Sequence, residues 1–67
     1  DLEEAVQVLG RAAASAGDNP IIRYHYAYAL AKRGDRDGAR RELQAMLATD
    51  MPADTRESAL KLAESLR

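Results

Sequence analysis

The stretch NPIIRYHYAYALAKRGDRDGARREL, residues 19–43, contains two helical patterns on either side of a Gly-Asp pair. Apolar residues recur in each pattern at the steps of one helix face: Ile22, Tyr26, Ala27 and Leu30, then Ala39, Leu43 and Met46. Gly34 can adopt the left-handed conformation that ends a helix, and Asp35 can cap the next helix. The stretch therefore predicts two antiparallel helices, about 20–33 and 36–49, joined by a short turn.

A third helical pattern precedes this pair. Its apolar residues share one stripe: Leu2, Ala5, Val6, Leu9, Ala12, Ala13 and Ala16. Gly17 can end this helix, while Asn19 and Pro20 suit the cap and the first position of the following helix. Residues 2–16 are therefore predicted to form a helix.

A fourth pattern fills the C-terminal part of the chain. Its apolar stripe consists of Ala59, Leu62, Ala63 and Leu66, with Leu60 beside it. Two starting points fit this pattern. Pro52 suits a first helical turn, and Asp54 with Glu57 has the spacing of a capping box. Either start predicts a helix that ends near Leu66.

A 34-residue step relates the N-terminal pattern to the pattern that follows the Gly-Asp pair. The step carries Ala5 onto Ala39 and Leu9 onto Leu43. A period of this length is typical of helix-pair arrays, in which each unit buries its apolar face on its neighbours. We therefore predict an all-α fold: a right-handed stack of antiparallel helical hairpins with four helices.

The composition narrows the classes of function. Hydrophobic residues make up 46% of the 67 residues, much of this share is alanine, and Trp, Phe and Cys are absent. Small side chains let helices approach closely, and without cysteine there is no disulfide within these residues. The net charge is −1 with acids and bases interleaved, so no nucleic-acid interface is expected. No apolar run approaches the ~18 residues of a membrane helix, so no direct membrane insertion is expected.

Residues 20–50 resemble a tetratricopeptide repeat. That family packs two antiparallel helices per repeat, with small residues where the helices touch. Aligned on the Gly-Asp pair, Ala27 and Ala39 fall on the small positions of the two helices. Leu30, Leu43 and Met46 fall on the family's packing positions. The resemblance implies a scaffold that binds partners on its surface.

The resemblance also implies a place in an array for each part of the chain. Residues 1–17 correspond to the second helix of a preceding repeat, residues 18–51 to one complete repeat, and residues 52–67 to a C-terminal capping helix. The chain begins at Asp1 directly in a helical pattern, so we expect it to be a piece of a longer protein.

A narrower resemblance concerns the biological setting. The runs NP (19–20), IRYH (22–25), ALAK (29–32) and ARREL (39–43) are similar to the C-terminal repeats of lipoproteins of the bacterial PEP-CTERM/exosortase system. This resemblance implies a bacterial cell-envelope or periplasmic setting linked to exopolysaccharide, with the lipid-bearing cysteine far upstream of this chain. Without it, a cytoplasmic protein is expected. The composition alone fixes no compartment.

A second face of the helix at 20–33 carries the candidate binding site: Ile21, Tyr24, Tyr28 and Lys32 on one side, with His25 beside them. The repeat resemblance implies that this face lines the concave groove in which related modules hold an extended peptide or a partner helix. Tyrosine suits such a place because it offers a large, rigid contact area with a polar tip. Some family members grip a C-terminal carboxylate with lysine and asparagine, but the matching positions here are tyrosines, so that specificity is not expected. The alternative is that this face packs on a further helix of the protein, and the two roles are compatible.

No catalytic, metal or cofactor site is expected. His25 is the single histidine and has no carboxylate three or four residues away. The run DRDG at 35–38 lacks the length and the final glutamate of a calcium loop, and is interpreted as a helix cap. Three arginines form a modest basic patch, but acids in the same helix favour ion pairing over DNA contact: Arg36, Arg40 and Arg41.

The sequence therefore predicts a protein–protein interaction or scaffold module with no enzymatic activity. Its protein or peptide partner is expected in the groove of Ile21, Tyr24, His25, Tyr28 and Lys32. Two alternatives stay open. The segment can be a purely structural C-terminal cap with binding carried upstream, or it can form a homodimer through the exposed stripe of the helix at 2–16.

Overall fold

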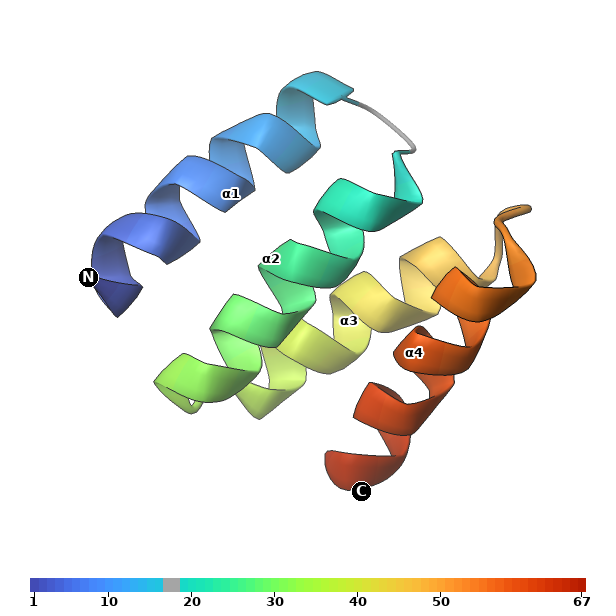
Figure 1. Cartoon of the computed structure of the whole chain (residues 1–67). Helices are drawn as coiled ribbons and strands as arrows, with labels where there is room; N and C mark the ends of the chain where they lie inside the picture. The colour runs from blue at the N-terminus through green and yellow to red at the C-terminus, as the bar shows by residue number, and fades with distance from the viewer. Residues whose placement is uncertain (17–18) are drawn as a thin grey trace.

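The computed structural model describes residues 1–16 and 19–67 and, of Ala16, only the backbone. The described residues form four helices: α1 (Leu2–Ala16), α2 (Pro20–Arg33), α3 (Arg36–Leu47) and α4 (Ala53–Ser65). Figure 1 shows that consecutive helices run in opposite directions. The all-α prediction is confirmed. The helix end predicted at Gly17 lies outside the described residues.

The start of α2 follows the predicted chemistry. Asn19 Oδ1 accepts hydrogen bonds from the backbone N–H groups of Ile21 and Ile22, at 3.0 and 3.4 Å. Pro20 occupies the first helical position, where its missing N–H leaves no hydrogen bond unmade. Asn19 is therefore the N-cap residue of α2.

The turn between α2 and α3 is also as predicted. Gly34 has a φ of 97°, and its N–H donates to Ala31 O at 3.1 Å. Asp35 caps α3, because its Oδ1 accepts from the N–H of Gly38 at 2.9 Å. The interpretation of residues 35–38 as a helix cap is confirmed.

Two helix boundaries differ from the predictions. Helix α3 ends at Leu47 rather than at 49, because the N–H and the hydroxyl of Thr49 both turn back onto Met46 O, at 3.0 and 2.8 Å. The capping-box start of α4 is wrong. Pro52 precedes the helix with a φ of −57°, and Asp54 lies inside the first turn, where its carboxylate accepts from Thr55 N–H at 2.8 Å.

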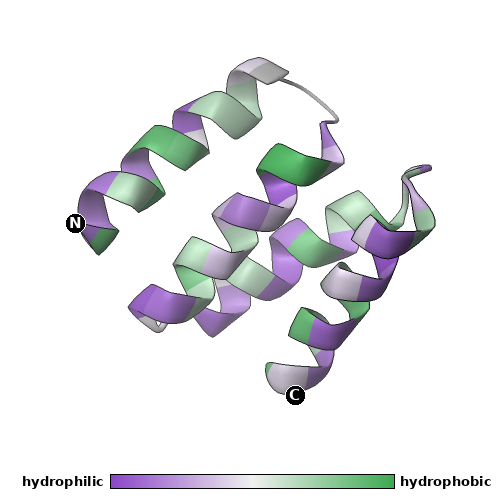
Figure 2. Cartoon of the chain, viewed as in Figure 1, coloured by the Kyte–Doolittle hydropathy of each residue, from purple (hydrophilic) through white to green (hydrophobic). Residues whose placement is uncertain are grey.

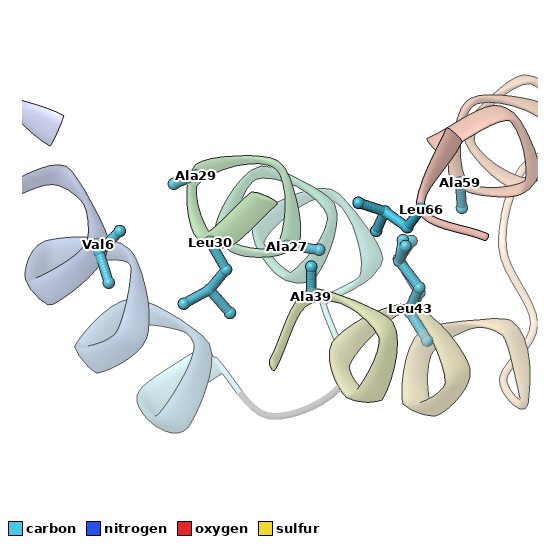
Figure 3. Close-up of a cluster of buried hydrophobic side chains, with 9 residues drawn as sticks. Val6, Ala27, Ala29, Leu30, Ala39, Leu43, Ala59 and Leu66 are labelled. Carbon is cyan, nitrogen blue, oxygen red and sulfur yellow. The ribbon is translucent and has the colours of Figure 1, made fainter. Parts of the chain in front are cut away.

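The core is built on close contact between small residues. Ala27 of α2 and Ala39 of α3 are both 0% exposed, and their Cβ atoms point toward each other in Figure 3. Leu43 and Met46 extend this contact along α3 toward α4. Alanine at the crossing lets the two helix backbones approach, as the repeat alignment predicted.

The outer helices pack on this pair from opposite sides. Val6 of α1 is buried against α2, and Ala59 of α4 and Leu66, which directly follows α4, are buried on the other side of the pair (Figure 3). Tyr26 is only partly buried, with its ring over Gly10 of α1. Figure 2 shows hydrophobic and hydrophilic segments alternating along the helices, as amphipathic helices require.

Arginine side chains fasten α4 to α3 at both ends. Arg36 and Arg40 donate to Leu66 O at 2.9 and 3.4 Å, and Arg56 donates to Thr49 O at 2.9 Å. The last carbonyls of a helix lack intrahelical partners, so these arginines satisfy groups that the helices cannot.

The expectation that the arginines of α3 pair with acids is correct only in part. Arg40 pairs with Asp37 at 2.8 Å, but the ordered hydrogen bonds of Arg36 go to backbone carbonyls at the end of α4. The basic patch is therefore partly used in packing one helix on the next.

Candidate functional site

Two hollows lie between α2 and α4. The first, called here the Asp54 hollow, has a volume of about 230 Å³. It is lined by Ile21, Tyr24 and His25 of α2 and by Asp54, Thr55 and Ser58 of α4. It therefore lies where both helices begin.

The second, called here the Lys32 hollow, has a volume of about 280 Å³. It is lined by Tyr28, Ala31 and Lys32 of α2 and by Leu62, Ser65 and Leu66 of α4. It lies where the same two helices end, so the two hollows follow one another along a single shallow groove between α2 and α4.

The structure places all five sequence-predicted site residues on this groove, divided between its two halves. Ile21, Tyr24 and His25 line the Asp54 hollow, and Tyr28 and Lys32 line the other. Sequence reasoning missed the wall contributed by α4. A signal was present, because four residues of that wall are spaced four apart and so share one helix face: Asp54, Ser58, Leu62 and Leu66.

Aromatic contacts join the two halves of the groove. The rings of Tyr24 and Tyr28 are 6.4 Å apart between centroids, and the His25 ring meets Tyr24 edge-on at 5.8 Å. Lys32 Nζ lies 5.4 Å from the centroid of the Tyr28 ring. At an exposed site such a cation–π contact contributes about 0.5–1 kcal/mol, so it helps to hold Lys32 along the groove.

The groove residues differ in how much of them faces solvent. Ile21 and Tyr28 are 54% and 44% exposed, so two large apolar side chains face solvent on the same groove. Tyr24 is partly buried and packs against the core. Tyr28 and Ile21 therefore offer free surface, whereas Tyr24 serves both the core and the groove wall.

The charges on the groove are not neutralised within the described part of the chain. Among residues 1–16 and 19–67, no ion pair involves the Asp54 carboxylate or the Lys32 ammonium group. Some charged residues elsewhere are paired, for example Arg33 with Glu3 at 2.8 Å and Lys61 with Glu57 at 3.6 Å. The groove thus carries an acid at one end and a base at the other.

A third hollow, of about 180 Å³, lies away from this groove among α1, α2 and α3. Its charged residues, Arg23 and Glu42, pair with each other at 3.4 Å across α2 and α3. Within residues 1–16 and 19–67, no three His, Asp or Glu side chains are placed to hold a metal ion. None of the described helices has the length and apolar character needed to cross a membrane.

Comparison with known proteins gives one result. A family model described as "Tetratricopeptide repeat" matches residues 1–65. No curated protein and no solved structure matches the chain. Repeats of the matched family are non-catalytic modules that generally mediate protein–protein interaction or scaffolding.

Proposed function

The chain belongs to the tetratricopeptide repeat family, and on that premise we propose that it binds a peptide or a partner helix in the groove between α2 and α4. The binding residues on α2 are Ile21, Tyr24, His25, Tyr28 and Lys32. The observation that carries the proposal is the exposure of Ile21 and Tyr28 at two successive hollows between α2 and α4.

Burial of this surface would supply the affinity. Removing apolar surface from water is favourable by about 25 cal/mol per Å², and tyrosine is enriched among the residues that dominate binding interfaces. The hydroxyl groups of Tyr28 and Ser65 border the Lys32 hollow and can hydrogen-bond a partner backbone. His25, Asp54 and Ser58 all line the Asp54 hollow, but among the described residues no hydrogen bond or ion pair joins them, and the matched family is a non-catalytic module, so we propose that the chain is not an enzyme.

Selection from a displayed library of random peptides tests this function. Clones enriched on the wild-type protein should lose most of their binding to Tyr28→Ala, because that substitution removes an exposed tyrosine ring, 44% accessible, from the groove. Val8→Ala is the matched control, since Val8 is 54% exposed on α1 and lies outside the groove. Circular dichroism of each variant separates lost binding from lost folding. Enriched clones that bind Tyr28→Ala and wild type equally would count against the groove.

We also propose the array assignment: residues 1–17 as the second helix of a preceding repeat, 18–51 as one repeat, and 52–67 as a C-terminal cap. One comparison supports it. Ala39 is fully buried against α2, whereas Ala5, its counterpart 34 residues earlier, is only partly buried. In that assignment a preceding helix would cover Ala5. If binding is carried upstream, substitution at Tyr28 would lower stability and leave partner binding unchanged.

A second candidate function is self-association through α1. Val6 and Ala13 of the predicted stripe are buried, but Leu2 of that stripe is 41% exposed, and a second copy could bury it. Sedimentation at increasing concentration tests this candidate. A mass that stays that of one chain up to high micromolar concentration would remove it.

The narrower resemblance leads to a proposal about setting. The runs at 19–32 and 39–43 support a place in the bacterial PEP-CTERM/exosortase lipoprotein family, and hence in the cell envelope. The parent gene decides this directly. A lipoprotein leader with its modified cysteine, followed by further repeats, is the expected finding, and a parent protein without a leader would rule the setting out.

A further inference from the structure

The geometry points to a groove that selects its peptide by charge. We propose that the Asp54 hollow takes a basic side chain and that the Lys32 hollow takes an acidic side chain of one extended partner peptide. The two peptide residues are four positions apart. This inference rests on the proposed function, since it assumes that a peptide occupies the groove, and it adds the chemistry of that peptide.

The Asp54 hollow combines the features that bind a lysine or arginine side chain. One wall carries the Asp54 carboxylate, which accepts a hydrogen bond from its neighbour Thr55 and has no ion-pair partner among the described residues. The facing wall carries the Tyr24 ring, whose face attracts cations. Thr55 and Ser58 add hydroxyl acceptors. No lysine or arginine lines this hollow.

The Lys32 hollow has the opposite character. Among the described residues, Lys32 is the only charged one that lines it; the Ser65 hydroxyl on the α4 side already donates to Leu62 O at 2.7 Å, so the donor groups of this hollow are those of Lys32 and Tyr28. Contact with the Tyr28 ring, 5.4 Å from Nζ to the centroid, holds the ammonium group beside the hollow. One positive charge matches one side-chain carboxylate. A single lysine is a poor clamp for a chain terminus, so we assign this hollow to an acidic side chain.

The distance between the hollows sets the spacing of the peptide residues. Tyr24 and Lys32 lie eight residues apart on α2, which corresponds to about 12 Å along the helix axis. An extended chain advances about 3.3 Å per residue, so four residues cover about 13 Å. In an extended chain, residues i, i+2 and i+4 point to the same side. The residue between the two charges would therefore lie on Tyr24 and Tyr28.

The positions of Asp54 and Lys32 also have a competing explanation, because each charge has the sign that the dipole of its own helix favours. Asp54 lies in the first turn of α4 and Lys32 in the last turn of α2, where the helix dipole favours these signs. A role limited to the dipole would affect stability and leave peptide binding unchanged. The two explanations therefore differ in a measurable quantity, the coupling between each groove charge and each peptide charge.

The test uses four capped heptapeptides and measures their dissociation constants by NMR titration of the protein. The parent peptide is Gly-Lys-Thr-Leu-Thr-Glu-Gly, and the others replace its Lys, its Glu or both by Gln. A peptide with the Lys and the Glu exchanged is also measured. The order of charges that binds wild-type protein more tightly is used for the comparison of variants. On the wild-type protein, each replacement is expected to weaken binding about threefold at low salt, the size of one exposed ion pair.

The protein variant Asp54→Asn removes the charge and keeps the side-chain shape, and Lys32→Gln removes the charge and keeps a polar side chain of similar length. With the Asp54→Asn protein, replacing the peptide Lys by Gln should leave the dissociation constant unchanged. Replacing the peptide Glu by Gln should still raise the dissociation constant about threefold. On Lys32→Gln the pattern should be the reverse. Glu57→Gln and Lys61→Gln are the matched controls, because this exposed pair lies on α4 outside both hollows and the wild-type pattern should persist.

Failure of this inference can be told apart from failure of the groove. If all four peptides bind wild type equally and Tyr28→Ala abolishes that binding, charge selection is wrong and the groove remains. The same conclusion follows if peptide charges matter equally on wild type and on both groove variants. If library-selected clones do not depend on Tyr28, the groove itself is wrong.

Discussion

At the scale of single residues, Gly34 shows most directly how the sequence fixes the fold. Its φ of 97° is left-handed, and no atom lies within 4 Å of the position that a Cβ would occupy, so a substitution meets conformational strain and no clash. We expect Gly34→Ala to lower the free energy of unfolding by about 1–2 kcal/mol. Gly34→Asn should lose less, because asparagine tolerates this conformation. Urea unfolding followed by circular dichroism measures both, and equal losses would contradict the explanation.

Asp35 and Gly38 form a second residue-scale unit. A Cβ on Gly38 would lie 2.5 Å from Asp35 Oδ2, so alanine there must displace the carboxylate that caps α3. Asp35→Ala alone should cost about 1 kcal/mol of stability. Gly38→Ala alone should be close to neutral, because the lost cap offsets the roughly 1 kcal/mol that alanine gains over glycine in a helix.

The double variant distinguishes this explanation from a simple loss of packing. In the Asp35→Ala background no cap remains to be lost, so adding Gly38→Ala should raise stability by up to about 1 kcal/mol. Thermal and urea unfolding of the four proteins complete the cycle. If Gly38→Ala has the same effect with and without Asp35, the two residues are not coupled.

At the scale of helices, the crossing of α2 and α3 depends on two alanines. Ala27 and Ala39 are both 0% exposed, and neither side chain can grow without moving a backbone. Ala39→Leu is expected to cost about 1–3 kcal/mol, the usual penalty for overpacking a core. Ala45→Leu, on the exposed side of the same helix, should change stability by less than about 0.5 kcal/mol. Similar effects at both positions would mean that the crossing is looser than described.

Helix α4 depends on arginine as well as on apolar packing. Arg56 donates to Leu47 O at 3.3 Å and to Thr49 O at 2.9 Å, which ties the start of α4 to the end of α3. Arg56→Met keeps most of the apolar stem and removes both hydrogen bonds, so stability should fall by about 1 kcal/mol. The exposed Arg41→Met is the control and should be nearly neutral. Unfolding in urea reports both changes.

The helices themselves were predictable because local chemistry determines them. Asn19, Gly34 and Asp35 act on backbone groups one to four residues away, and the structure shows the predicted caps. The burial of alanines was harder to predict. Ala39 and Ala45 look alike in the sequence, yet one is fully buried and the other exposed. Alanine is too small to show by itself which face of a helix is inward, so Ala39 was distinguished by its spacing to Leu43 and Met46 and by the repeat alignment.

One wall of the candidate site could be predicted from the sequence, and the other could not. The α2 side of the groove follows from the four-residue spacing of its tyrosines, a property of one helix. The α4 side depends on how two helices separated by α3 come to lie side by side, which no local pattern reveals. Asp54 illustrates the difficulty, because its sequence context suggested a helix cap. The structure places it second in α4, inside the first turn, where it lines the Asp54 hollow of the groove.

At the scale of the whole molecule, stability should decrease from the middle pair of helices outward. Helices α2 and α3 contain the fully buried contact of Ala27 with Ala39, whereas α1 packs on α2 alone. Stacked repeats open from their ends because each element depends on its nearest neighbours. Hydrogen exchange read by mass spectrometry should therefore show the slowest exchange in α2 and α3. Equal protection in all four helices would indicate a single cooperative unit.

The thickness of the molecule explains why its surface matters so much. The Cα atoms span 30 × 27 × 16 Å, so the smallest dimension corresponds to about two layers of helices. In so thin a molecule every helix has one face packed in the core and another face exposed to solvent. The same α2 therefore supplies Leu30 to the interior and Tyr28 to the groove.

The 34-residue step that superposes Ala5 on Ala39 also makes the molecule extensible. If residues 18–51 form one repeat, as we propose, a duplicate spliced directly after the original would place a second α2 against α3, in the position that α2 has against α1 here. Each inserted duplicate would add one groove helix, about 10 Å from the last. Longer ligands could then be accommodated by genetic tandem duplication, provided that the face of α3 is made to match that of α1.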